Sequence, residues 1–141
     1  MQYVYIEPEV AGGLGDHTVM DRSVHPPIVS KLHYQMEGWL GDALLESFPV
    51  FIVTEQAKQG LLASGLTGAT FADAEVTTTG DFRELYPERE VPAFDWLKPE
   101  GEAGHDDFGT ASDGRLVVSE RALDVLRKFG AAHALVEPFG K

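Results

Sequence analysis

The sequence predicts a single compact α+β domain, in which two similar strand–helix–strand units pack with further strands in a mixed sheet; an α/β arrangement is the alternative. The first observation behind this is an internal echo, because residues 51–57 (FIVTEQA) return 65 positions later as residues 116–122 (LVVSERA). The second is that a glycine follows each predicted helix, Gly65 in one copy and Gly130 in the other. The third is the length of 141 residues, which suits one domain over residues 1–141 that folds unaided.

The first unit spans about residues 49–72. Its continuous apolar run, Val50–Val53, is typical of a strand covered on both faces. Thr54 suits an N-cap, because its hydroxyl can accept a hydrogen bond from a free amide of the first helical turn. Glu55 then places a negative charge at the positive end of the helix dipole. After the helix, residues 69–79 are predicted to form a strand.

The second unit, residues 114–137, repeats the pattern. Ser119 is the predicted cap, and Ala122, Leu123, Leu126 and Phe129 recur at helical spacing on one face. The last strand is predicted over residues 134–136. Duplication of one ancestral unit explains the echo, but so does chance reuse of a common local pattern.

The remaining segments are less regular. We predict strands over residues 3–6, 28–34 and 91–97, a turn and short helix within residues 39–46, and a short helix over residues 81–86 with Asp81 as its cap. Residues 11–30 and 99–114 are predicted to be largely loop. Strand alternation is expected to turn one of Phe94 and Trp96 into the core.

Charge is the strongest compositional signal. Eleven basic residues face 23 acidic residues, for a formal net charge of −12. Such a surface repels nucleic acid and anionic membranes, and it either attracts a cationic partner or serves solubility alone. The chain has no cysteine and no apolar run near the roughly 20 residues of a membrane-spanning helix. The first residues do not form a signal peptide, so we expect a cytoplasmic protein.

The most suggestive chemical cluster is His105-Asp106-Asp107, followed by Asp113. A histidine beside carboxylates can bind a metal or act as an acid–base pair. The alternative is a solvated acidic loop, with Phe108 turned inward. No pair of histidines has metal-ligand spacing on a helix, so we expect no cofactor. Residues 12–15 are glycine-rich and could cradle a phosphate, but Asp16 favours a mobile surface loop.

We expect the acidic loop and one exposed aromatic residue to bind a protein partner. Aromatic side chains within polar surroundings often anchor interfaces. The predicted contact residues are Trp39, Glu100, Glu102, Asp106, Asp107 and Asp113, with the acidic segment over residues 81–90 beside them.

Residues 115–138 combine an aliphatic strand, a Ser-Glu step into a leucine-rich helix, a Phe129-Gly130 stop and a final Val136-Glu137-Pro138. This arrangement resembles the C-terminal element of immunity proteins from bacterial polymorphic toxin systems, and residues 49–66 share it in part. The resemblance implies a small, acidic, non-catalytic protein that binds a toxin domain. It transfers no active-site residue to this chain.

We therefore expect a binding protein rather than an enzyme, one that neutralises a basic toxin domain by steric and electrostatic occlusion. The first alternative is a small metal-dependent hydrolase built on His105, Asp106 and Asp107. The second is a structural or interaction domain with another partner.

Overall fold

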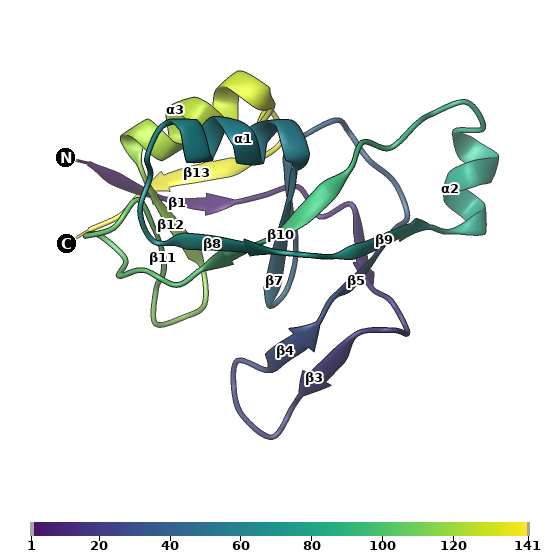
Figure 1. Cartoon of the computed structure of the whole chain (residues 1–141), viewed down its shortest axis with the longest axis horizontal. Helices are drawn as coiled ribbons and strands as arrows, with labels where there is room; N and C mark the ends of the chain where they lie inside the picture. Colours follow the sequence, from purple (N-terminus) through teal and green to yellow (C-terminus); the bar gives the residue numbers. More distant parts are fainter. Residues whose placement is uncertain (1, 141) are drawn as a thin grey trace.

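The computed structural model describes residues 2–140, and over this range it has an α+β fold with four sheets and three helices (Figure 1). Sheet A contains, in order, β11 (Phe108–Thr110), β12 (Leu116–Ser119), β1 (Tyr3–Glu7) and β13 (Leu135–Pro138). Sheet B contains β6 (Leu44–Ser47), β7 (Val50–Thr54), β10 (Phe94–Pro99) and β8 (Ala69–Ala72). Sheet C contains β2 (Gly12–Leu14), β5 (His33–Met36) and β9 (Glu75–Thr78). The helices are α1 (Glu55–Ala63), α2 (Gly80–Leu85) and α3 (Glu120–Phe129).

Sheets A and B have the same design. In each, the two strands that flank a helix run parallel, and one antiparallel strand lies between them: β10 between β7 and β8, and β1 between β12 and β13. The register repeats as well. Leu97 pairs with Phe51 and Phe71, whereas Ile6 pairs with Leu116 and Val136, which lie 65 positions further along. The echo in the sequence is therefore also an echo in strand register.

The predicted helix ends are confirmed. The hydroxyl of Thr54 accepts a hydrogen bond from the Ala57 amide at 3.2 Å, and the hydroxyl of Ser119 accepts one from the Ala122 amide at 3.2 Å. Gly130 follows α3 with a φ of +128°, a backbone conformation that favours glycine. The two helices lie side by side above the sheets (Figure 1).

Two hydrophobic cores result. The first lies where α1 and α3 cover the inner faces of sheets A and B, and its largest members are Ile6, Leu44, Phe51, Leu61, Leu97, Phe108, Leu116, Leu123 and Leu126. The second lies between the other face of sheet B, sheet C and α2, and its largest members are Tyr34, Met36, Leu45, Ile52, Phe82, Phe94 and Trp96. The prediction that strand alternation turns one of Phe94 and Trp96 into the core is wrong, because both are buried. Residues two apart on a strand point to the same face.

Several irregular segments are more ordered than predicted. Residues 11–30 contain β2, and β3 (Val19–Asp21) and β4 (Ile28–Lys31) form a two-stranded hairpin, sheet D, that projects from the body (Figure 1). The glycine-rich stretch is thus a strand and not a mobile loop. Gly12 is needed there because an added Cβ would lie 1.9 Å from the carbonyl oxygen of Gln35 on β5.

The helix predicted within residues 39–46 is wrong, because that segment ends in β6. Leu44 enters the first core and Leu45 the second, so the apolar side chains alternate with the period of a strand. The short helix near residue 81 exists, but its cap is Thr79, whose hydroxyl accepts from the Phe82 amide at 3.0 Å. Two predicted strands, residues 28–34 and 69–79, are each divided in two.

The contact between α1 and α3 can be tested at Gly60, where an added Cβ would lie 2.4 Å from the ring of Phe129. Gly60→Leu should displace the Phe129 ring and lower the free energy of unfolding by about 1 kcal/mol in chemical denaturation, because overpacking of the contact outweighs the gain in helix propensity. Gly80→Leu is the control, because an added Cβ at Gly80 has nothing within 4 Å. Equal losses at both positions would contradict the helix contact as the cause.

Candidate partner-binding site

The segment between β10 and β11 forms an exposed acidic loop, which we define as residues 100–106. Glu100 and Glu102 are exposed and Asp106 is half-buried. The Thr70 hydroxyl donates to Glu100 Oε1 at 3.0 Å, and the Glu102 amide donates to Asp106 Oδ2 at 2.8 Å. The loop is therefore held in place while its carboxylates reach solvent.

Two predicted contact residues stay ionised well into acid. The backbone amide of Glu102 lowers the pKa of Asp106. Asp113 lies in the turn between β11 and β12, where the amide and then the guanidinium of Arg115 lower its pKa. Both groups keep their negative charge at neutral pH and below.

Asp107 differs from its neighbours, and the expectation that it lies in a solvated loop is wrong. It is 4% exposed, because β11 begins with Phe108 and draws the preceding residue inward. Its carboxylate accepts from Arg121 Nη2 at 2.9 Å, from the Ser119 hydroxyl at 2.5 Å and from the Thr67 amide at 2.9 Å. Burial alone would raise the pKa of Asp107, but the hydrogen bonds from Arg121, Ser119 and Thr67 outweigh it and hold that pKa well below its usual range.

The His105-Asp106-Asp107 cluster does not converge on one point. The His105 side chain is largely exposed, and its Nδ1 lies 3.9 Å from Asp106 Oδ2. Asp107 turns the other way, toward Arg121. Among residues 2–140, these three are not one of the groups whose ligand atoms lie close enough to share a metal. Phe108 is buried, as the loop alternative predicted.

Trp39 is half-buried against the second core rather than fully exposed. Its indole nitrogen donates to the Asp42 carbonyl at 3.0 Å, and the Arg89 guanidinium lies over its ring at 5.1 Å. The neighbouring Leu40 is 60% exposed. Trp39 thus belongs to the side of the molecule formed by sheet C and α2, whereas the acidic loop contacts sheet A.

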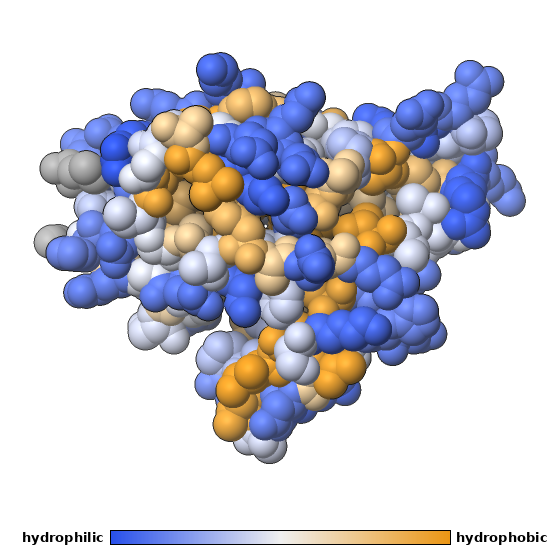
Figure 2. Space-filling view, viewed as in Figure 1, coloured by the Kyte–Doolittle hydropathy of each residue, from blue (hydrophilic) through white to orange (hydrophobic). Residues whose placement is uncertain are grey.

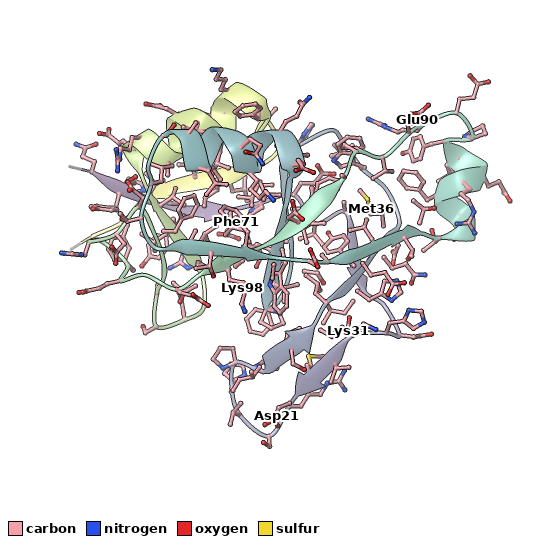
Figure 3. The ribbon with its side chains drawn as sticks, viewed as in Figure 1. Asp21, Lys31, Met36, Phe71, Glu90 and Lys98 are labelled. Atoms are coloured by element: carbon pink, nitrogen blue, oxygen red, sulfur yellow. The ribbon has the colours of Figure 1, made fainter. Side chains whose placement is uncertain are left out.

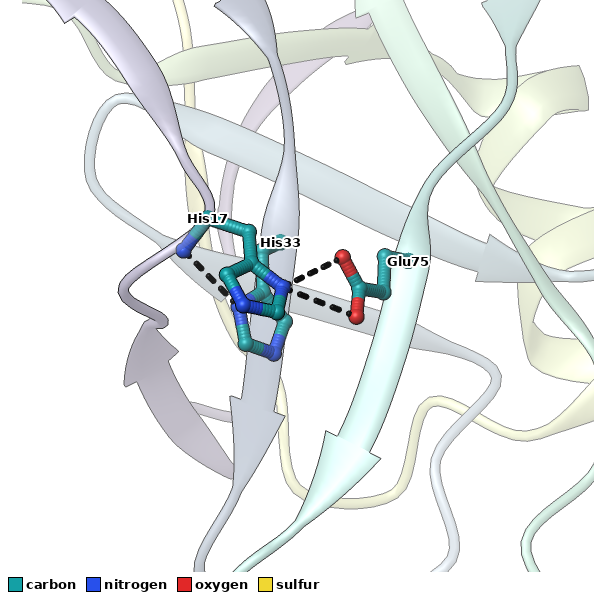
Figure 4. Close-up of side chains that lie close together, drawn as sticks. All are labelled: His17, His33 and Glu75. Atoms are coloured by element: carbon teal, nitrogen blue, oxygen red, sulfur yellow. Dashed lines mark hydrogen bonds and ion pairs between the residues drawn. The ribbon is translucent and has the colours of Figure 1, made fainter.

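A histidine cluster, which the sequence did not indicate, joins the base of the projecting hairpin to sheet C (Figure 4). His17 Nδ1 lies 3.0 Å from Glu75 Oε1, and the imidazole rings of His17 and His33 stack with centroids 4.8 Å apart. The His17 amide donates to His33 Nδ1 at 3.2 Å, which leaves the proton of that ring on Nε2, 2.8 Å from the Thr77 hydroxyl. Both nitrogens of His33 have partners, so a metal would have to displace one, and the contacts suit a structural join.

A second cluster, Glu9, Asp42 and His133, closes the junction after α3. Glu9 accepts from the amides of Leu40 at 2.6 Å and Asp42 at 3.3 Å. Asp42 accepts from the His133 amide at 2.8 Å and lies 2.9 Å from its Nδ1. Among residues 2–140, no side chain hydrogen-bonds the other ring nitrogen.

The projecting hairpin carries apolar surface (Figure 2). Val19 is 54% and Ile28 60% exposed. Its charges are mixed, with Asp21 toward its far end and Lys31 toward its base (Figure 3). The hairpin therefore differs in chemistry from the acidic loop.

Comparison with protein-family models, with curated proteins and with solved structures found no match. Within residues 2–140, the helices are too short and too polar to cross a membrane.

The ion pair of Asp107 should stabilise the fold. Asp107→Asn should lower the free energy of unfolding at neutral pH by about 2 kcal/mol, because the amide removes the charge and one of the buried oxygens that accept from Arg121, Ser119 and Thr67. The pKa of Asp107 is lower in the folded state, so the wild-type carboxylate stabilises above about pH 4 and loses that effect as pH falls through the folded-state pKa. Urea denaturation across acid pH should therefore show a flatter profile for the variant. Asp113→Asn, at an exposed carboxylate, is the control. An equal loss of unfolding free energy there would refute the claim that the ion pair of Asp107 stabilises the fold.

Proposed function

We propose that the chain is a cytoplasmic acidic binding protein, an immunity protein that neutralises a basic bacterial toxin domain by covering it. The observation that carries the proposal is the acidic loop, whose carboxylates point to solvent while Asp107 anchors its end to Arg121. The net charge of −12 and the resemblance of residues 115–138 to immunity proteins agree with this role.

The physical mechanism has two parts. The negative field steers a positively charged partner toward the loop, which can raise association rates by about 10- to 1000-fold. A prearranged surface then loses little conformational freedom on binding, so more of the contact energy remains as affinity. The steric bulk of the bound protein blocks the partner's own active site.

The hydrolase alternative gains no support from the geometry. Asp107 turns away from His105 and Asp106, and it is already engaged by Arg121 and Ser119.

Co-expression tests the proposal directly. We expect the chain to protect cells from the toxin encoded beside it and to elute with that toxin as one complex from a sizing column. Cell death despite co-expression, together with separate elution, would refute the proposed function.

Charge reversal tests the steering. Glu100→Lys combined with Glu102→Lys should slow association with the toxin about tenfold at low ionic strength, and the difference should shrink in high salt because exposed charges are screened. Stopped-flow fluorescence measures this rate. The control is Asp73→Lys with Asp124→Lys, two exposed positions with the same change in net charge. Equal slowing by both pairs would mean that net charge alone, and not the loop, guides the encounter.

A further inference from the structure

Two aromatic residues of β1 occupy the register positions of two buried aromatic residues of β10. Tyr3 pairs with the N-cap residue of α3, as Phe94 pairs with the N-cap residue of α1. Two positions further, Tyr5 in sheet A corresponds to Trp96 in sheet B. The same faces of the two similar sheets thus carry the same kind of side chain.

The two faces differ in what covers them. Over sheet B, sheet C and α2 form a second layer, which leaves Phe94 and Trp96 6% and 7% exposed. Over sheet A, the acidic loop covers the β11 side, where a Cβ on Gly109 would lie 2.5 Å from the Ala103 nitrogen. The β1 and β13 side has no such layer within residues 2–140, and Tyr3 and Tyr5 remain partly exposed.

An open groove of about 1190 Å³ lies along this uncovered side. Its walls are formed by Tyr3, Tyr5, Gly104, Val136, Pro138 and Phe139. The Tyr5 and Phe139 rings meet edge to face at 5.1 Å, and the Tyr3 hydroxyl donates to the His105 carbonyl at 2.8 Å. The acidic loop is therefore one wall of the groove.

The charges around the groove favour a cationic occupant. Arg115 lies with its guanidinium 3.6 Å from the centroid of the Tyr5 ring, and it is paired with Asp113 and Glu137. This contact shows that the surface accommodates a guanidinium between tyrosine and carboxylates. Glu7, on the same face of β1 by alternation, and Glu102, two residues before Gly104, lie outside the lining of the groove and make no ion pair with another described residue, so negative charge remains unmatched beside it.

We propose that this tyrosine face, defined by Tyr3, Tyr5, Glu137 and Phe139, is the docking surface for the toxin, and that it takes an arginine-bearing basic segment of that partner. The proposal rests on the proposed function and names its contact surface. The bound segment supplies to sheet A the second layer that sheet C supplies to sheet B.

The test compares variants of the complex with the toxin domain encoded beside the chain. Tyr5→Ala and Glu137→Lys, each checked for an unchanged melting profile, should weaken the Kd about 30-fold, as expected for anchor residues. Tyr5→Phe, which keeps the ring, should bind within about threefold of wild type. Ile28→Ser on the hairpin and Leu40→Ser beside Trp39 are controls at exposed apolar positions and should bind like wild type.

The outcomes separate the two proposals. A complex that tolerates both groove variants, or that is lost only with Ile28→Ser or Leu40→Ser, overturns the docking surface and leaves the proposed function intact. If no complex forms, the proposed function fails, and the groove is tested alone by titrating the ¹⁵N-labelled chain with a capped hexapeptide of alternating arginine and leucine. Amide shifts confined to residues 2–5, 104 and 136–139 support the tyrosine face, whereas shifts spread over all acidic segments, or none, overturn it.

Discussion

The hydroxyl of Ser119 joins the core of this protein to its candidate site. It accepts from the Ala122 amide and so begins α3, and it donates to the carboxylate of Asp107 at the end of the acidic loop. In the other unit, the equivalent cap is Thr54, and the residue that faces it across the sheet is Ala43. The Thr54 amide donates to the Ala43 carbonyl, as the Ser119 amide donates to the Asp107 carbonyl. At this position the first unit thus has the methyl group of Ala43, whereas the second unit has Asp107 with its ion pair. Only in the second unit does this residue anchor an acidic loop.

Local rules explain what could be predicted from the sequence. The caps Thr54 and Ser119 and the glycine after each helix depend on neighbours within a few residues, so their pattern is visible in the chain. Strand pairing between distant segments leaves no such visible pattern. His33 lies opposite Glu75 only because β5 and β9 run parallel, and nothing in either segment specifies that partner. The position of β1 at the centre of sheet A was equally hidden, since its partners lie more than a hundred residues away.

The candidate site shows the same limit. Asp106 and Asp107 are adjacent and chemically alike, and the sequence predicts that both face a partner. Their environments differ because β11 begins directly after Asp107. The carboxylate of Asp106 lies at the surface, whereas that of Asp107 contacts Arg121. Glu9 and Asp42 are also buried, and backbone amides rather than lysine or arginine satisfy them. Composition therefore overstates the charge that the surface presents, because part of it is used to hold the fold together.

The place of β1 also has a consequence for how the chain is made. All strands of sheet B lie between Leu44 and Pro99, so that sheet can assemble while later residues are still on the ribosome. Sheet A needs Tyr3–Glu7 between β12 and β13, so β1 has no neighbour until Ser119 has emerged and only one until Pro138 has followed. Contacts of such wide sequence separation close slowly. The half of the molecule that carries the candidate site is thus the last to be completed, and an unfinished chain has sheet B but no finished surface to offer.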